Sequence, residues 1–188
     1  VTGVQTCALP ICRSDFFRAE LMHALRILDE GHIGRNDMKG SWAGAMGQSQ
    51  FMPSSFATYA VDWDLDGRRD IWTTKGDVFA SAANYLSRSG WRAGLPWGGP
   101  VSLPAGFDTS LEGNRKTMPL TDWLALGVAW IGEGPEVALD EETSLVMPGG
   151  EDGPAWLVFN NYRTILKWNH SNYFAMSVVT LADAIAGR

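Results

Sequence analysis

Three aspartates alternate along one short stretch of the chain and are followed by a glycine: Asp62, Asp64, Asp66 and Gly67. Carboxylates at alternate positions can turn toward one hard cation such as calcium, and the glycine permits the sharp turn that such a loop needs. The next residue, Arg68, would add its main-chain carbonyl oxygen. The spacing therefore predicts a calcium-binding loop.

The loop reproduces the first half of an EF-hand but departs from it in the second half. Thr73 stands at the twelfth position, where a bidentate glutamate is expected, and the nearest acid downstream is Asp77. A solvated acidic turn is the alternative interpretation. If calcium binds, we expect it to be structural, so that stability rises with free calcium.

A second stretch, residues 40–56 (GSWAGAMGQSQFMPSSF), combines small residues, neutral polar side chains and aromatic rings without a charge. Its glycines let a backbone or a ligand approach closely. Ser41 and Gln50 can hydrogen-bond to sugar hydroxyls, and rings such as Phe51 offer flat faces to sugar C–H groups. The stretch predicts the floor of a saccharide-binding cleft. A glycine-rich helix packed in a core is the alternative.

Composition excludes several classes of protein. The 188 residues carry a net charge of -6, which argues against a nucleic-acid partner because no basic face is available to neutralise phosphates. Hydrophobic residues make up 45% of the chain and charged residues 19%, as in a globular protein. No apolar run approaches the length of a membrane span. We expect a monomeric globular protein.

The glycine-rich stretch resembles the signature of the B-type lytic murein transglycosylases, lysozyme-like bacterial enzymes that cut the glycan strands of peptidoglycan. The resemblance continues in the family's order and spacing through residues 59–72 (YAVDWDLDGRRDIW), 81–91 (SAANYLSRSGW) and 156–178 (WLVFNNYRTILKWNHSNYFAMSV). It covers the chain from Ser14 onward. It implies a periplasmic enzyme that cleaves the MurNAc–GlcNAc bond with a 1,6-anhydro product, and a calcium loop closed at the position of Asp77.

The resemblance also implies a set of substrate-binding residues. Ser41 and Gln50 correspond to polar residues near the catalytic acid, and Phe51 corresponds to an aromatic wall of the cleft. Tyr85 corresponds to a sugar-contacting tyrosine, and Trp168 with Asn169 to an aromatic platform followed by an asparagine. His170 is a weaker candidate for a general base, because lone histidines more often satisfy a local hydrogen bond.

The family's catalytic glutamate acts first as an acid and then as a base, while the C6 hydroxyl of the sugar attacks C1. It matches no residue in 13–188. We therefore expect the catalytic glutamate to lie upstream of this chain, and we expect the isolated chain to release no muropeptides. Glu20 is a tempting acid, but a carboxylate on an amphipathic helix usually lies on a solvated face. A non-catalytic, calcium-stabilised peptidoglycan-binding module is the alternative, and a calcium sensor is weaker because only one loop is present.

The expected fold class is α+β and predominantly helical: a lysozyme-like core with an EF-hand-like loop and a small β-rich insertion. A helix over residues 14–29 should bury a stripe of Phe17, Leu21, Leu25 and Leu28, and further helices should cover residues 53–60, 74–90, 121–126 and 173–186. Runs such as VSLP and SLVMP predict strands between residues 92 and 155. The predicted domains are 13–91 (core with the calcium loop), 92–155 (insertion) and 156–188 (return to the core).

Residues 1–12 (VTGVQTCALPIC) resemble the in-frame translation of a sequencing-library adapter, so we expect them not to be biological sequence. Both cysteines, Cys7 and Cys12, fall there, and a metal or redox site is a minor alternative because no histidine accompanies them. A membrane anchor is expected only through an N-terminus that the chain does not contain.

Overall fold

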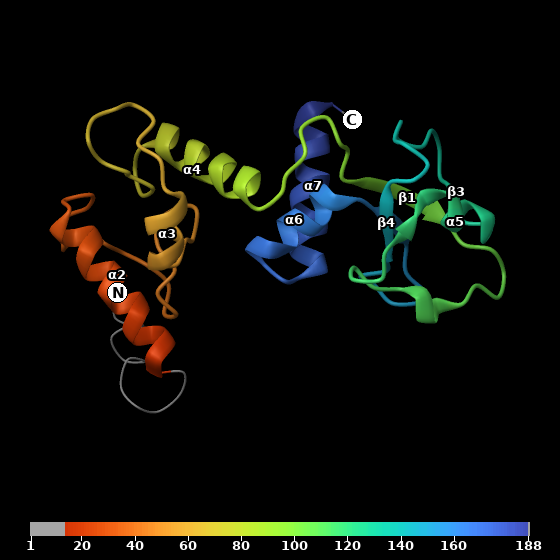
Figure 1. Cartoon of the computed structure of the whole chain (residues 1–188), viewed down its shortest axis with the longest axis horizontal. Coiled ribbons are helices and arrows are strands. Elements are labelled where there is room, and N and C mark those ends of the chain that lie inside the picture. Colours follow the sequence, from red (N-terminus) through yellow and green to blue (C-terminus); the bar gives the residue numbers. More distant parts are fainter. Residues whose placement is uncertain (1–13, 188) are drawn as a thin grey trace. The chain divides into compact units, whose positions relative to one another are not determined.

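The structure is a computed structural model that describes residues 14–187. The chain divides into two compact units between Arg88 and Ser89, and each is described by itself. The first is helical and the second combines helices with a small antiparallel sheet (Figure 1). The expected α+β class is therefore confirmed. The prediction for residues 1–12 lies outside the described residues, and the predicted domain boundaries stay predictions.

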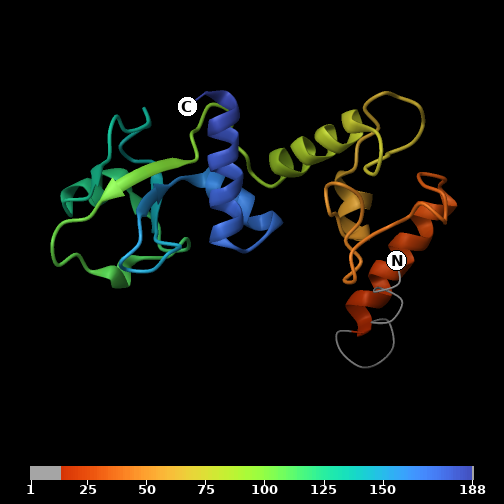
Figure 2. The same ribbon diagram turned by 180° about the vertical axis from the view of Figure 1, so that it is seen from behind.

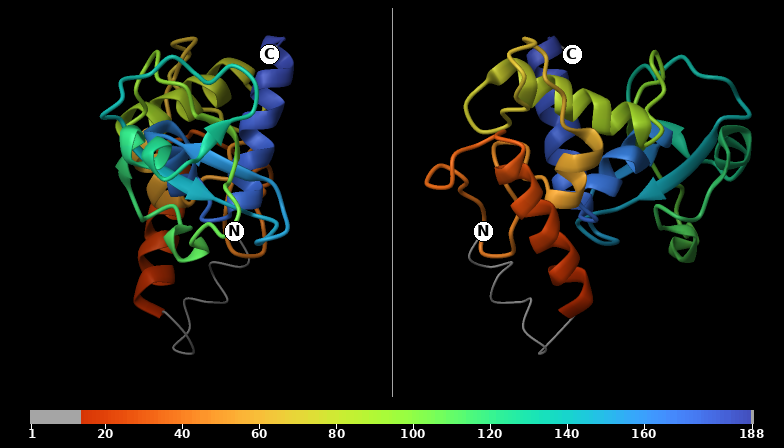
Figure 3. Two further views of the ribbon diagram at one scale, coloured as in Figure 1. Left: turned by 90° about the vertical axis from the view of Figure 1, so that its right-hand side faces the viewer. Right: turned by 60° about the vertical axis from the view of Figure 1, so that its left-hand side comes forward.

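The first unit contains three helices: α2 (Ser14–Asp29), α3 (Pro53–Tyr59) and α4 (Lys75–Arg88). Helices α2 and α3 lie side by side, and a wide loop joins α3 to α4 (gold in Figure 1; Figure 3). Pro53 lies in the first turn of α3, where its fixed φ suits a helix start and its missing N–H costs nothing. These helices begin and end close to the residues predicted from the sequence.

The carboxylate of Glu20 caps the N-terminus of α3. The residue at the N-cap, Met52, makes no side-chain cap, and instead Ser54 donates its N–H to Glu20 Oε2 (2.9 Å) and its hydroxyl to Oε1 (2.6 Å). Glu20 is only 3% exposed. The prediction that this carboxylate lies on a solvated face is therefore wrong: it stabilises the positive end of a neighbouring helix.

The buried face of α2 also differs from the predicted stripe. The helix buries Glu20, Ala24 and Ile27, whereas Leu25 is 48% exposed. The face turned toward α3 carries Glu20, and the other three residues of the predicted stripe, Phe17, Leu21 and Leu28, are only half-buried. The predicted stripe is therefore shifted on the helix, because periodicity counts apolar residues only and here a hydrogen-bonded carboxylate is part of the buried face.

The second unit is built on a five-stranded antiparallel sheet with the order β2-β4-β5-β1-β3. Figure 2 shows this unit from behind. The strands are β1 (Gly98–Ser102), β2 (Met118–Pro119), β3 (Ala129–Trp130), β4 (Glu142–Val146) and β5 (Ala155–Val158). A short 3-10 helix, η1 (Thr109–Leu111), lies between β1 and β2. The two apolar runs predicted as strands fall in or beside β1 and β4.

Helix α5 (Leu120–Ala125) packs its apolar side chains into the core of this unit. Trp123 is 1% exposed, and its indole N–H donates to the carbonyl of Thr143 (3.0 Å). The surrounding core consists of Val101, Leu120, Val128, Leu145, Met147, Ala155 and Leu157. The predicted helix in this region is confirmed.

Two further helices follow the sheet: α6 (Asn160–Trp168) and α7 (Asn172–Ala186). Ser171 caps α7 by accepting the N–H of Phe174, as the sequence predicts. Burial raises the pKa of the Tyr162 hydroxyl to about 12. Helix α6 was not predicted, because its inner face is partly polar: Asn161 and Thr164 are buried there.

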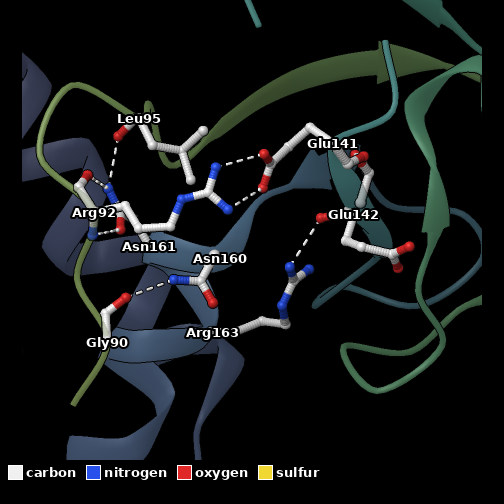
Figure 4. A network of polar contacts seen from close by, with 9 residues as sticks. Gly90, Arg92, Leu95, Glu141, Glu142, Asn160, Asn161 and Arg163 are labelled. Carbon is white, nitrogen blue, oxygen red and sulfur yellow. Dashed lines mark hydrogen bonds and ion pairs between the residues drawn. The ribbon is translucent and has the colours of Figure 1, made fainter. Parts of the chain in front are cut away.

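Asn161 attaches the segment before β1 to α6 (Figure 4). Its Nδ2 donates to the carbonyls of Arg92 (2.8 Å) and Leu95 (2.6 Å), and its Oδ1 accepts the N–H of Arg92 (2.8 Å). The guanidinium of Arg92 forms a two-pronged ion pair with Glu141, at 3.0 and 2.6 Å. A buried amide with all three of these bonds made fixes the chain in one position.

Within residues 14–187, no helix has both the length and the apolar character needed to cross a lipid bilayer.

Replacing Glu20 tests its role as a cap. We expect Glu20→Ala to lower the free energy of unfolding by about 3 kcal/mol, because it leaves two donors of Ser54 without a charged acceptor. Arg18→Ala, at an exposed position of the same helix, should change it by less than about 0.5 kcal/mol. Both values come from denaturant titration of the full chain, and equal effects of the two substitutions would contradict the cap.

Candidate functional site

The glycine-rich stretch is a folded loop and not a helix. Two antiparallel bridges shape it, one between Gly40 and Met46 and the other between Met46 and Phe51. Backbone hydrogen bonds join Met46 and Phe51 in both directions, at 2.8 and 3.1 Å. The alternative interpretation of a glycine-rich core helix is therefore wrong, and the neutral polar side chains lie on a compact loop.

Gly47 brings this loop into direct contact with the backbone of Ile71. A Cβ on Gly47 would lie 2.5 Å from the carbonyl oxygen of Ile71, and its φ of +63° is in the left-handed region. Next to it, Gln48 donates its backbone N–H to the same carbonyl (2.8 Å) and its amide to the carbonyl of Trp72 (2.8 Å). The indole of Trp72 in turn donates to the carbonyl of Lys39 (3.0 Å). Glycine is needed here because any side chain would separate the two segments.

A hollow of about 400 Å³ opens where these segments meet. It is lined by Lys39, Gly40, Ser41, Gly47, Gln48, Gln50 and Trp72. Its volume lies within the range of ligand pockets, roughly 300–1,000 Å³. Four of the seven lining residues are neutral polar or aromatic, two are glycines and one, Lys39, is charged. The saccharide-binding role of the stretch stays a prediction.

Ser41 and Gln50 both line the hollow and are held by local hydrogen bonds. Ser41 Oγ accepts the N–H of Ala45 (3.1 Å), and Gln50 Nε2 donates to the carbonyl of Gly47 (2.8 Å). Gln50 has a positive φ of 50°. The Ser41 hydroxyl hydrogen and the Gln50 amide oxygen take no part in these two bonds. The side chains are therefore positioned while retaining capacity for a ligand's hydroxyl groups.

The other predicted substrate residues lie elsewhere. Phe51 is 2% exposed, and its ring packs against Tyr59 and Tyr85 at centroid distances of 6.5 and 5.8 Å. Neither Phe51 nor Tyr85 is among the residues that line the hollow. Trp168 and Asn169 end α6 in the second unit. The roles of these four residues stay predictions.

Sequence reasoning missed the contribution of Trp72 and Lys39. Trp72 directly follows the acidic loop, and its place in the hollow depends on a bond to a carbonyl 33 positions away. The signal that could have found it is an aromatic residue within a block that resembles the family. Residue type alone could not place it, since an indole serves equally well in a core.

The acidic loop brings three carboxylates together. Ligand atoms of Asp62, Asp64 and Asp77 all lie within 4.8 Å of one another. Asp77 is 1% exposed, and its two oxygens accept the N–H groups of Trp63 (2.8 Å) and Asp70 (2.7 Å). Asp77, which lies outside the normal EF-hand spacing, is therefore part of the cluster and stands in the first turn of α4.

The cluster has the features of a site for a hard cation. Asp62 Oδ2 accepts the N–H of Gly67 (2.9 Å), while Oδ1 of the same carboxylate is buried and has no hydrogen-bond partner. The pKa of Asp64 is raised, first by loss of solvation and then by the negative charges of the neighbouring aspartates. A divalent cation would satisfy the orphaned oxygen and offset the repulsion, so these carboxylates fit calcium.

Two aspartates of the loop are engaged in turns. Asp66 Oδ1 accepts the N–H of Arg68 (2.8 Å), and Asp66 lies outside the cluster of three. Asp70 Oδ1 accepts the N–H groups of Trp72 (2.8 Å) and Thr73 (2.9 Å). Burial acts to raise the pKa of Asp70, but these hydrogen bonds outweigh it and the pKa is lowered. Asp66 and the carbonyl of Arg68 stay predicted ligands.

Comparison with known proteins identifies the family. The family model described as Transglycosylase SLT domain matches residues 1–183. Membrane-bound lytic murein transglycosylase B of Escherichia coli is 32% identical over 180 residues, which are 93% of this chain and 47% of that protein.

Solved structures give the same result. SltB3 from Pseudomonas aeruginosa in complex with NAG-anhNAM-pentapeptide has a TM-score of 0.92 and 48% identity, over 98% of this chain and 50% of that one. The lytic transglycosylase Slt35 of Escherichia coli in complex with calcium has a TM-score of 0.82 and 29% identity, over 98% of this chain and 58% of that one.

The chain belongs to the Transglycosylase SLT domain family, whose lytic transglycosylases act on the peptidoglycan of the cell wall. Its fold is that of Slt35. The family predicted from the sequence is thus confirmed. The chain spans about half the length of the curated relative and of the SltB3 chains that it matches.

Two glycines with the same backbone conformation test how closely the loop must approach Ile71. We expect Gly47→Ala to lower the free energy of unfolding by about 3 kcal/mol, because its methyl group would overlap the Ile71 carbonyl. Gly31 has a φ of +76° but open space around it, so Gly31→Ala should cost only about 1 kcal/mol. Denaturant titration measures both, and equal costs would show that the close approach is not required.

Proposed function

We propose that this chain binds the glycan strands of peptidoglycan in the hollow lined by Ser41, Gln48, Gln50 and Trp72, as part of a periplasmic lytic murein transglycosylase. The observation that carries the proposal is the hollow itself: about 400 Å³, lined by two glycines, neutral polar side chains, an indole and a single charged residue, in a member of this family. The solved structures of SltB3 in complex with NAG-anhNAM-pentapeptide and NAG-NAM-pentapeptide support it. We further propose that the first unit belongs to a lysozyme-like core.

The chemistry of the lining suits a sugar ring. Hydroxyl and amide groups of Ser41 and Gln50 can pair with the hydroxyls around a pyranose, while the indole of Trp72 offers an apolar face to the ring's C–H groups. Lys39 adds the one charge in the lining. The neutral hydrogen-bonding groups beside an aromatic ring suit recognition of a saccharide.

The reaction that we propose for the whole enzyme is cleavage of the MurNAc–GlcNAc bond with a 1,6-anhydro product. It requires a carboxylic acid beside the leaving oxygen. Glu20 cannot serve, because both of its oxygens accept hydrogen bonds from Ser54 and its side chain is buried. Since the family's catalytic glutamate matches no residue of the chain, we propose that the chain binds glycan strands without cutting them.

We also propose that Asp62, Asp64 and Asp77 hold a calcium ion. Calcium would supply positive charge to three carboxylates that otherwise repel one another, and it would fix the loop between α3 and α4. The structure of Slt35 in complex with calcium supports this assignment.

Incubating the chain with purified peptidoglycan tests binding and cleavage together. We expect the chain to sediment with the polymer and to release no anhydromuropeptides by mass spectrometry. Ser41→Ala/Gln50→Ala should weaken binding about tenfold, because two neutral hydrogen bonds at about 0.7 kcal/mol each are lost. Asn36→Ala, which changes an exposed polar residue outside the hollow, serves as the control.

Two results would contradict this proposal. Unchanged binding by the double variant would place the glycan elsewhere. Release of 1,6-anhydro products by the unmodified chain would show that one of its own carboxylates is the catalytic acid.

Calorimetry of the full chain tests the calcium site. At a calcium concentration about 100 times the dissociation constant, the free energy of unfolding of the first unit should rise by about 2.7 kcal/mol. Asp62→Asn should remove most of this gain, because it removes one charge from the cluster. Asp29→Asn, an exposed position with the same change of charge, should keep it.

Asp66→Asn distinguishes the predicted ligands from the observed cluster. If only the three clustered aspartates hold the ion, this variant should keep most of the response to calcium. A melting temperature of the unmodified chain that is indifferent to both calcium and chelator would refute the site.

A further inference from the structure

A second hollow, of about 410 Å³, lies entirely in the second unit. It is lined by Asn114, Arg115, Arg163, Leu166, Lys167 and His170. Two arginines and a lysine therefore face one space with no carboxylate among the lining residues, in a chain whose net charge is -6. This concentration of positive charge favours an anionic ligand.

Arg163 supplies a cation without a carboxylate partner. Its Nη1 donates to Ser144 Oγ (3.1 Å) and the Val158 carbonyl (3.3 Å), and its Nη2 donates to the Glu142 carbonyl (2.8 Å; Figure 4). Within residues 14–187 no carboxylate oxygen lies within ion-pair distance of it, unlike Arg92, which pairs with Glu141. Burial lowers the pKa of Arg163, and the negative charges of Glu141 and Glu142, which lie beyond ion-pair distance, only partly oppose this. A partly buried charge that is bonded only to neutral acceptors gains from an added anion.

Hydrogen bonds position the segments that carry the other two cations of the hollow. Lys167 Nζ donates to the carbonyl of Ser89 (2.5 Å). Arg115 lies in a turn closed by the bond from Lys116 N to the Gly113 carbonyl (2.9 Å), and Ser144 Oγ donates to the carbonyl of Asn114 (3.3 Å). These bonds fix the amine of Lys167 and the turn that carries Arg115 before a ligand arrives, which lowers the entropy lost on binding.

We propose that this basic hollow binds the carboxylates of the peptide stem that peptidoglycan carries on its NAM sugar. The inference rests on the proposed function, because it takes peptidoglycan as the substrate. Lys167 and His170 flank Trp168 and Asn169, the predicted saccharide contacts at the end of α6, so the chain itself places a sugar platform beside the cationic lining. The hollow distinguishes strands that bear peptides from strands that have lost them.

Calorimetric titration of the full chain measures this preference. The probes are NAG-NAM without peptide, NAG-NAM-pentapeptide, the same pentapeptide ligand with amidated carboxylates, and inorganic phosphate. We expect the pentapeptide ligand to bind about tenfold tighter than NAG-NAM, and amidation to abolish the difference, because charged hydrogen bonds to the carboxylates are lost. Added salt should weaken only the peptide-dependent part.

Variants locate the effect in the hollow. Arg115→Gln/Lys167→Gln should reduce the preference for the pentapeptide ligand to about twofold or less while leaving the affinity for NAG-NAM unchanged. Arg115→Gln alone changes an exposed turn and should lower the preference for the pentapeptide ligand about threefold. It controls for a folding defect that replacing Lys167 could cause. Arg18→Gln/Arg35→Gln removes the same charge from exposed positions outside the hollow and should keep the preference.

The outcomes separate this inference from the proposed function. A preference for the pentapeptide ligand that survives in the double variant would overturn the inference and leave glycan binding intact. Phosphate that displaces the pentapeptide ligand at equal concentration would also overturn it, because the hollow would then be a general anion site. Failure of the unmodified chain to bind either saccharide would overturn the proposed function and the inference together.

Discussion

The contact between the backbones of Gly47 and Ile71 is the constraint on which the candidate site depends. It brings the glycine-rich loop against the segment that follows the acidic loop, and the hollow opens where the two meet. That segment is itself held by Asp77, which accepts the N–H of Asp70. The hollow and the acidic cluster share no residue, but the same short segment, residues 70–72, contacts both. The charge state of the acidic cluster and the shape of the hollow are therefore linked through the short stretch from Asp70 to Trp72.

Much of the fold could be predicted because its signals are local. Pro53 starts α3, Ser171 caps α7, and alternating aspartates before a glycine make a tight acidic loop, all within a few positions of the chain. In each of these cases the physical cause acts between near neighbours, so residue type and spacing are enough. The glycine-rich stretch supplies five of the seven residues that line the hollow, but the contacts with Ile71 and Trp72 that shape it are not local.

What could not be predicted depends on partners far apart in the sequence. Glu20 looks like a surface carboxylate until its bonds to Ser54, 34 positions away, show that it caps another helix. Helix α6 was missed because Asn161 is buried by bonds to a segment 66 to 69 positions earlier. The same holds for Arg163, whose acceptors lie on β4 and β5. Polar residues are buried when distant groups satisfy them, and no periodicity of apolar residues records this.

The short edge strands of the sheet limit how other protein chains can pair with it. Both edge strands, β2 and β3, are only two residues long, and β2 ends in Pro119, which has no N–H to offer. An outside chain that tried to extend the sheet would find almost no free backbone donors or acceptors to pair with. The sheet is thus protected against strand-by-strand aggregation through its two short edge strands.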